Sequence, residues 1–190
     1  MRHILIIFSI LLLFSFTIIS CKSSTSSTTS TDNTTVSFVT VGWNGTILTS
    51  SDGTTWTERT SGIFRNLSGV TYGNGLFVTV GESGTILTSP DGITWTQRTS
   101  GTPKELYGVT SGNGLFVTVG FFGTILTSPD GITWTERTSG TWVYLRGVTY
   151  ASSAFVTVGK SGTILTSPDG TTWTSRTSGT SNELRGVTSR

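Results

Sequence analysis

The chain has 190 residues, of which 24 are glycine and only 12% are charged. Glycine and the β-branched threonine that crowds the sequence are poor helix formers, so this composition favours short strands joined by tight turns. The formal net charge is +2 and no run of basic residues occurs, which excludes an electrostatic nucleic-acid binder. The single histidine, His3, and the single cysteine, Cys21, lie near the start of the chain. The remainder therefore has no Cys/His zinc site, disulfide or Ser-His-Asp triad, and we expect neither a metal nor a cofactor.

The first 20 residues have the pattern of an export signal. Arg2 precedes an apolar run from Ile4 to Ile19, which is interrupted only by hydroxyl residues and is short for a transmembrane helix. The run ends in Ile18-Ile19-Ser20-Cys21, which resembles the bacterial lipobox. That resemblance implies cleavage before Cys21 and attachment of acyl chains to it, and several chains together give a stable membrane anchor. The alternative is an ordinary signal peptide followed by an incidental cysteine.

Residues 21–35 are expected to form a disordered tether. The stretch from Lys22 to Thr35 is rich in Ser and Thr and has no apolar residue to bury. We therefore expect an exported protein that its lipid anchor holds in the cell envelope. Because Lys22 rather than an Asp follows Cys21, the enterobacterial sorting rule favours the outer membrane or the cell surface over the inner membrane.

Residues 36–190 consist of four near-identical repeats of 39 residues without insertions. Each repeat divides into four candidate strands separated by turn residues. In the third repeat these strands begin at Leu106, Leu115, Thr124 and Ile132. Four antiparallel strands in a repeat of about 40 residues are typical of a propeller blade, so we predict an all-β fold, a β-propeller of four-stranded antiparallel blades.

The two ends of the repeat region predict how the propeller closes. The chain enters the first repeat at its second strand, from Ser37, and ends with the first strand of a repeat, from Leu184. We therefore predict that the C-terminal strand completes the first blade and closes a ring of four blades. Two alternatives stay open: a half-ring that dimerises into eight blades, or a fragment of a longer array. The expected state is a monomer, or a dimer if the four repeats form a half-ring.

The turn between the third and fourth strands of each repeat carries the motif Ser-x-Asp-Gly-x-Thr-Trp. This motif resembles the Asp-box, or BNR repeat, of sialidase-like propellers and of the photosystem II assembly factor family, although that family usually places the Gly one residue further from the Asp. The resemblance implies a structural turn on the face away from an active site, with the Asp bound to backbone amides and the Trp packed in the blade. The residues concerned are Asp52, Asp91, Asp130 and Asp169, with Trp56, Trp95, Trp134 and Trp173.

The repeats differ mainly in two regions, the turn between the second and third strands and the link from the fourth strand to the next repeat. Because neighbouring strands are antiparallel, both regions must lie on the same face of a propeller. Clustered aromatics and arginines there predict a binding face, with Trp43, Phe121 and Phe122 exposed and the arginines near an anionic group. The alternative is neutral drift of unconstrained loops after duplication. The candidate binding residues are Trp43, Phe64, Tyr107, Phe121, Phe122, Trp142, Tyr144, Arg146 and Arg185.

We predict a non-catalytic binding or scaffold module that recognises a glycan or a protein through this face. One alternative is a sialidase-like glycoside hydrolase, which needs arginines, a carboxylic acid and a tyrosine nucleophile. These residue types occur on the same face, without a recognisable motif, as Glu82, Glu105, Glu183, Tyr107, Tyr144, Arg146 and Arg185. The other alternative is an assembly factor for a membrane protein complex, like the photosystem-linked family, whose members have more blades and less uniform repeats.

Overall fold

A computed structural model describes residues 35–190 of the chain, which belong to one compact unit. The predicted signal peptide (1–20), the lipidation site at Cys21 and all but the last residue of the predicted tether lie outside the described residues. Residues 35–190 contain no helix that is long and apolar enough to cross a membrane.

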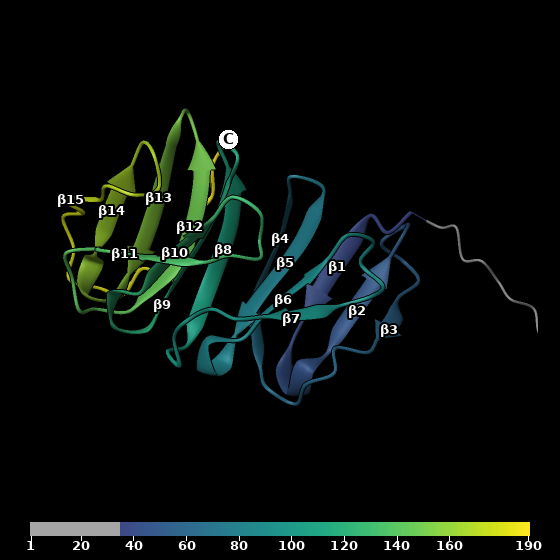
Figure 1. Ribbon diagram of the computed structural model, residues 1–190. Helices are drawn as coiled ribbons and strands as arrows, with labels where there is room; N and C mark the ends of the chain where they lie inside the picture. Colours follow the sequence, from purple (N-terminus) through teal and green to yellow (C-terminus); the bar gives the residue numbers. More distant parts are fainter. Residues whose placement is uncertain (1–34) are drawn as a thin grey trace, which may run out of the picture. The chain divides into compact units, whose positions relative to one another are not determined.

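The only regular elements among residues 35–190 are strands and single-turn 3-10 helices. Three complete blades have four antiparallel strands each, and a first sheet has three (Figure 1). The first sheet comprises β1 (Phe38–Val41), β2 (Ile47–Ser50) and β3 (Thr57–Arg59). The complete blades comprise β4 (Leu67–Gly73), β5 (Leu76–Gly81), β6 (Ile86–Ser89) and β7 (Thr96–Arg98); β8 (Leu106–Gly112), β9 (Leu115–Gly120), β10 (Ile125–Ser128) and β11 (Thr135–Arg137); and β12 (Leu145–Ala151), β13 (Ala154–Gly159), β14 (Ile164–Ser167) and β15 (Thr174–Arg176). The all-β fold of propeller-type blades is thereby confirmed.

The 3-10 turns join the second and third strands of each sheet. They are η1 (Trp43–Gly45), η2 (Glu82–Gly84), η3 (Phe121–Gly123) and η4 (Lys160–Gly162). In each of them the middle residue has a positive φ, between 51° and 57°. The glycine that follows also has a positive φ, and the next N–H donates back to the carbonyl of the first residue, as Thr85 does to Glu82 over 3.1 Å, so the two central residues form a two-residue hairpin turn of type I′.

The Asp-containing turns have the same hydrogen bonds in all four repeats. In the second blade the Asp91 carboxylate accepts the backbone N–H groups of Ile93 and Thr94, each over 2.8 Å. Ser89 Oγ accepts the N–H of Gly92, which needs its positive φ of 74°. These bonds agree with the role that the resemblance implied. They also explain why the fourth strand begins three residues later than predicted in the third repeat, at Thr135 rather than Ile132.

The core lies between successive blades. Phe116 of β9 and Leu126 of β10 pack against Val78 and Val80 of β5 in the second blade. Phe155 and Leu165 pack in the same way against the third blade. Each blade therefore buries two unlike faces, one rich in Phe and Leu and the other in Val and Ile, and the burial of both stabilises the stack.

The inner strands β4, β8 and β12 lie side by side, and glycine permits their close approach. A Cβ atom on Gly108 would lie 3.1 Å from the carbonyl oxygen of Arg146 in the next inner strand. The last segment of the chain continues this row, because a Cβ atom on Gly147 would lie 3.1 Å from the carbonyl oxygen of Arg185.

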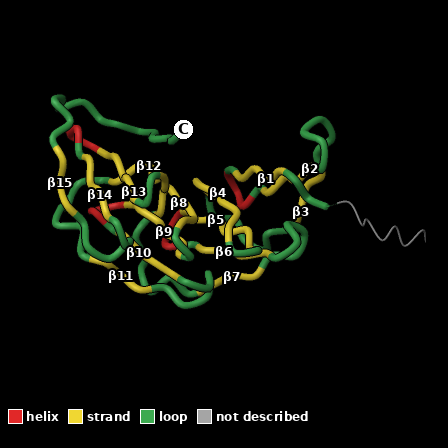
Figure 2. The backbone as a smooth tube through the Cα atoms, turned by 90° about the horizontal axis from the view of Figure 1, so that it is seen from above, coloured by secondary structure: helices red, strands yellow, loops and turns green. Residues whose placement is uncertain are grey.

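The predicted closure of the ring is wrong in this structure. Among residues 35–190, the C-terminal segment forms no strand and β1 pairs only with β2. The blades fan out as an open arc, with the inner strands on its concave side (Figure 2). The physical reason is that the inner strands pack in one row through their glycines, so that the C-terminal segment, as the last member of the row, lies against β12 rather than beside β1.

Candidate functional site

The turns and links that differ between repeats lie at the same end of the blades. The backbone N–H of Glu82 in η2 donates to the carbonyl of Asn66 over 2.9 Å, which joins a turn to the link before β4. The N–H groups of Phe121 and Lys160 repeat this contact at the next two links, each over 2.8 Å. We call this end the loop face. It comprises residues 43–45, 60–66, 82–84, 99–105, 121–123, 138–144, 160–162 and 177–183 and the first residues of the inner strands.

A β-bulge at the start of each complete blade's inner strand directs one variable side chain onto the loop face. The register of β8 against β9 shifts between Leu106 and Gly108, and that of β12 against β13 shifts between Leu145 and Gly147. The extra residues in these bulges are Tyr107 and Arg146. A bulge is a usual means of redirecting a side chain near a functional site.

Arg146 is the centre of a cluster drawn from successive repeats. Its guanidinium carbon lies 4.5 Å from the ring centre of Tyr107 and 5.3 Å from that of Tyr144. Its Nε donates to Oε1 of Glu183 over 2.7 Å, and Arg185 reaches the other oxygen of Glu183 over 3.1 Å. Arg146 is therefore already neutralised within the protein, so the expectation that it would meet an anionic ligand is not supported by its contacts.

Two phenylalanines of η3 extend this cluster. The ring centres of Phe121 and Tyr144 lie 4.5 Å apart with the planes 29° from parallel, and Phe122 lies 4.1 Å from Phe121. Lys160 Nζ lies 5.3 Å from the ring centre of Tyr144. Such ring contacts contribute about 0.5–1.5 kcal/mol each beyond buried area. The tight turn therefore holds Phe121 half-buried, whereas it leaves Phe122 exposed as predicted.

The backbone of Phe122 has an unfavourable conformation. Its φ is 51°, in the left-handed region, where the corresponding residues of the other turns are Asn44, Ser83 and Ser161. A bulky residue in this region is uncommon, whereas Asn is enriched there. Strained backbone at an exposed aromatic residue is typical of functional positions rather than of the framework.

Tyr107, Arg146 and Glu183 keep their ordinary charges at neutral pH. Burial, together with the hydrogen bond to Glu105, raises the pKa of Tyr107 to about 12. The hydrogen bond from Arg146 lowers the pKa of Glu183. Burial alone would lower the pKa of Arg146, but its hydrogen bond to Glu183 and the charge of that carboxylate raise it. A tyrosine that stays protonated is a poor nucleophile, even though the Tyr107 hydroxyl donates to Glu105 over 2.6 Å.

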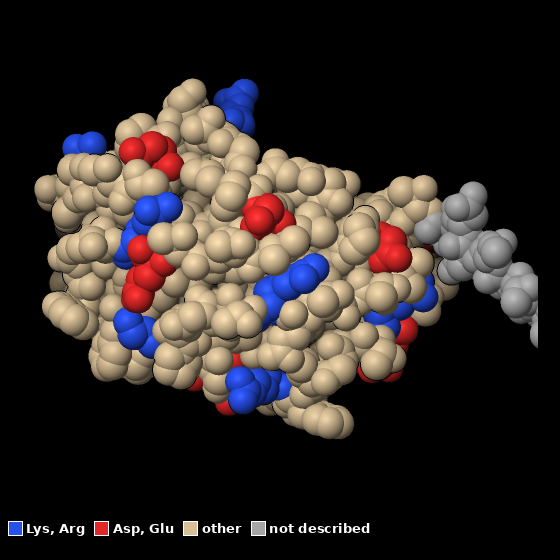
Figure 3. All heavy atoms as spheres, in the orientation of Figure 1, with Lys and Arg blue, Asp and Glu red and all other residues tan. Residues whose placement is uncertain are grey.

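Two adjoining depressions on the loop face share Glu82 and Glu105. One, of about 470 Å³, is also lined by Trp43 and Tyr107. The other, of about 350 Å³, is lined by Phe121 and Phe122 as well. Together they form an acidic groove with aromatic walls across the inner ends of the first three blades. The face of the molecule drawn in Figure 3 carries small separate groups of both signs without a continuous basic area.

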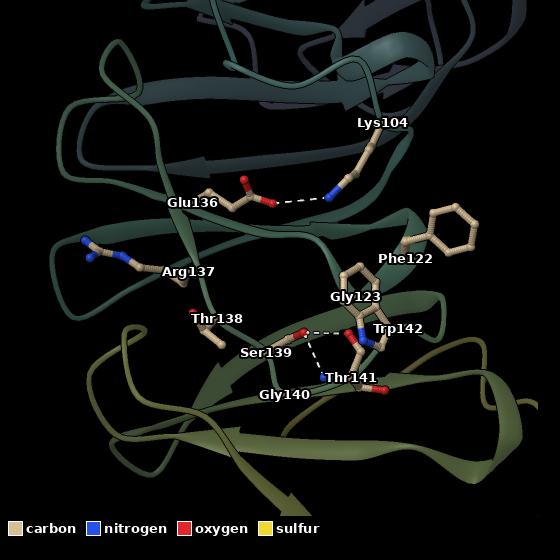
Figure 4. A pocket seen from close by; sticks show the side chains of 10 residues that line it. All are labelled: Lys104, Phe122, Gly123, Glu136, Arg137, Thr138, Ser139, Gly140, Thr141 and Trp142. Carbon is tan, nitrogen blue, oxygen red and sulfur yellow. Dashed lines mark hydrogen bonds and ion pairs between the residues drawn. The ribbon is translucent and has the colours of Figure 1, made fainter.

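A third depression, of about 520 Å³, lies further out on the third blade and its link (Figure 4). Phe122 and Trp142 stand at its rim, and the Lys104 ammonium bridges to Glu136 of the following repeat over 3.3 Å. Trp142 is 81% exposed. Residues 136–142 supply seven of its ten lining residues, and it shares Lys104 and Phe122 with the groove, so it extends the groove rather than forming a separate chemical centre.

The structure brings most, but not all, of the predicted binding residues together. Tyr107, Phe121, Phe122, Tyr144 and Arg146 form the central cluster. Trp43 lines the groove, and Trp142 lies at its outer end. Phe64 is 92% exposed and lines none of the three depressions described above, and the Arg185 side chain is 81% exposed. The roles of Glu82, Glu105 and Glu183 were not assigned to binding from sequence, although all three lie in or beside the variable regions.

The Asp-containing turns differ from the loop face in being nearly identical between repeats. Within residues 35–190, no three His, Cys, Asp or Glu side chains gather closely enough to hold a metal ion. The arginine that follows each blade's last strand serves the framework, as Arg98 and Arg137 do when Nε donates to Thr88 and Thr127 of the same blade over 2.9 Å.

The fold and the loop face define the class of the protein as an array of β-propeller blades with one varied, aromatic end. No family model and no curated protein matches the sequence. Among solved structures, the chain is similar to YCF48 bound to D1 peptide, with a TM-score of 0.62 and 25% identity over 79% of this chain and 53% of that chain. It is also similar to YCF48 from Cyanidioschyzon merolae, with a TM-score of 0.58 and 21% identity over 78% of this chain and 54% of that chain. The chain thus spans about half the length of these structures.

Proposed function

We propose that this chain is a non-catalytic binding protein whose loop face recognises a segment of another protein. The observation that carries the proposal is the cluster around Arg146, in which side chains from successive repeats meet. The same bulge in the second blade carries Ser68, so the fold does not require an aromatic or charged residue there. A cluster that the framework does not need, placed beside a groove and a strained Phe122, is best explained by ligand binding.

The two carboxylates of the groove favour a basic group in the ligand. Arg146 and Arg185 pair with Glu183, and Lys104 pairs with Glu136. Glu82 and Glu105 line the groove, and neither takes part in an ion pair among residues 35–190. A peptide with Lys or Arg beside an apolar residue would meet these carboxylates and the rings of Trp43 and Tyr107.

The likeness to YCF48 supports a protein as the class of ligand, because that protein has been seen bound to D1 peptide. It does not extend to the identity of the partner, since the chain spans about half of that structure. A role as an assembly factor for a membrane protein complex belongs to the same class of binding protein. A glycan is the other ligand class that an aromatic groove fits.

The test is binding of residues 34–190 to a peptide array and, in parallel, to a glycan array. We expect binding to peptides with adjacent basic and apolar residues, and at least tenfold weaker binding by Glu82→Gln/Glu105→Gln. The triple variant Trp43→Ala, Phe121→Ala, Trp142→Ala should also lose binding. Ile132→Ala is the control, because Ile132 is an exposed apolar residue that lies in an Asp-containing turn and not on the loop face. Unchanged peptide binding by the triple variant, or selective binding to glycans, would overturn the proposal.

We further propose that the chain is exported and held in the cell envelope by acyl chains on Cys21, with the outer membrane or cell surface as its location. The support is the lipobox-like Ile18-Ile19-Ser20-Cys21 and the Ser/Thr-rich stretch that follows it. Metabolic labelling with a palmitate analogue tests this proposal. We expect label on the native chain and none on Cys21→Ala, and membrane fractionation should then release the variant into the soluble fraction.

A further inference from the structure

The two ends of the blade array have complementary strand edges. β1 lacks the inner strand that every complete blade has, whereas the final segment, residues 184–189, continues the row of inner strands without outer strands of its own. This segment is docked at its start, because the N–H of Leu184 donates to the carbonyl of Gly159 over 2.9 Å. The N–H of Leu67 makes the same bond to Gly42 at the start of β4, also over 2.9 Å.

The repeat fixes how such a segment would pair with β1. In the complete blades the inner strand pairs with the second strand so that Thr71 is opposite Val78 and Thr149 is opposite Val156. By the 39-residue interval, Thr188 would lie opposite Val39. Thr40 would then donate to the carbonyl of Gly186, as Thr79 and its counterparts do to Gly69 and its counterparts over 2.9 Å.

The first blade leaves exposed the face that later blades bury. Phe38 is 49% exposed, while its counterparts Phe116 and Phe155 are fully buried. Leu48 is half-buried, in contrast to the buried Leu126. A Cβ atom on Gly53 would meet only Phe38 of its own blade, whereas one on Gly131 would meet the side chains of the preceding blade.

The last blade leaves exposed the opposite face. Val156 and Ile164 are half-buried, while Val78, Val117, Ile86 and Ile125 are fully buried. These two end faces are the same pair that meets at each junction inside the chain, Phe and Leu on one side and Val and Ile on the other. The exposed face of the last blade therefore matches the exposed face of the first blade in the same way as the two faces of each internal junction match.

We propose that two copies of this chain close one ring of eight blades by exchanging their final segments. Residues 184–189 of each copy pair with β1 of the other and complete its first blade. Each contact is head-to-tail, from the end of one copy to the start of the other, and two such contacts related by a two-fold axis close the ring and leave no unpaired edge. A second copy fits better than closure within one chain, because the three junctions give an open arc.

A pair of cysteines tests the exchange, because residues 34–190 contain no cysteine and form a compact unit of their own. In Val39→Cys/Thr188→Cys, oxidation should give a disulfide between copies and a covalent dimer on a non-reducing gel. Each single variant alone should give none, and a mixture of the two single variants refolded together should give the dimer. Val39→Cys/Ser189→Cys is the control, since Ser189 would face the other side of the sheet.

Each outcome decides the matter. A covalent dimer from the Val39/Thr188 pair alone supports the exchange. A disulfide within one chain would mean a closed four-blade ring and overturns it, as does the lack of any disulfide. Light scattering gives an independent measurement: we expect twice the monomer mass for the native sequence and the monomer mass for Phe38→Arg. Phe64→Arg, on the loop face, should stay dimeric. This inference does not depend on the proposed function.

Discussion

The guanidinium of Arg146 lies over the ring of Tyr107, 4.5 Å from its centre, although the two residues belong to successive repeats. The bulges in β8 and β12 direct both side chains onto the loop face. Gly108 allows the two strands to approach, because any Cβ atom there would press on the Arg146 carbonyl. The site thus follows from the close packing of inner strands together with one variable residue in each.

We expect Arg146 and Glu183 to stabilise the fold as a pair. In a double-mutant cycle with Arg146→Gln and Glu183→Gln, denaturant unfolding should give a coupling of about 0.5–1 kcal/mol, because both side chains are about three-quarters covered. The matched cycle with Arg185→Gln should give a coupling near zero, since that side chain is 81% exposed. Equal coupling energies for the two arginines would contradict this view of the cluster.

Phe122→Asn should reduce binding with little change in stability. Asn is better suited to a φ of 51°, which favours the variant by about 0.5–1 kcal/mol of unfolding free energy, but the lost ring contacts with Phe121 and Tyr144 offset this gain. Thermal unfolding and peptide binding measure the two effects. Ser161→Asn is the control, because Ser161 has the same backbone conformation in η4 and lines neither depression of the groove, and it should leave binding unchanged. A destabilised Phe122→Asn with full binding would contradict a functional role for the strain.

Truncation of the Phe116 side chain should strongly reduce the stability of the fold. It is fully buried between the second and third blades, so Phe116→Ala is expected to cost about 3–5 kcal/mol of unfolding free energy. Phe64→Ala should cost less than about 0.5 kcal/mol, since Phe64 is 92% exposed. Chemical denaturation of both variants checks the expected difference. A similar small loss for both would mean that the junctions between blades are not the core.

The framework could be predicted from sequence because it is repeated four times. The Trp, Phe and Gly periodicity and the Ser-x-Asp-Gly motif fix strands and turns through local hydrogen bonds such as those of Asp91. Closure could not be predicted, because the angle between blades depends on how closely glycines such as Gly108 and Gly147 let inner strands approach. The pairing of Arg146 with Glu183 was also missed, since it joins two repeats through a link whose path the periodicity does not give.

Acid should weaken the contribution of the Asp-containing turns. The N–H of Thr94, with that of Ile93 and the Ser89 hydroxyl, lowers the pKa of Asp91, although burial opposes this. A carboxylate whose pKa is lower in the folded state stabilises fully above its unfolded pKa of about 3.9 and loses that contribution as the pH falls through the folded value. The native chain should therefore exceed Asp91→Asn in free energy of unfolding by an amount that decreases as the pH falls from about 5 to about 2. A difference in unfolding free energy that stays constant across that range would contradict this prediction.

The loop face should not hydrolyse sialosides. A sialidase-like mechanism needs a tyrosine nucleophile beside a carboxylate, and Tyr107 does donate a hydrogen bond to Glu105. However, burial and that same carboxylate raise the pKa of Tyr107 to about 12, so the phenol stays protonated at neutral pH. Arg146, which would have to hold the sugar carboxylate, is already bonded to Glu183. We expect no release of fluorophore from a fluorogenic sialoside by residues 34–190. Turnover that Tyr107→Phe or Tyr144→Phe abolishes would instead establish an enzyme, because neither change removes a ring from the cluster.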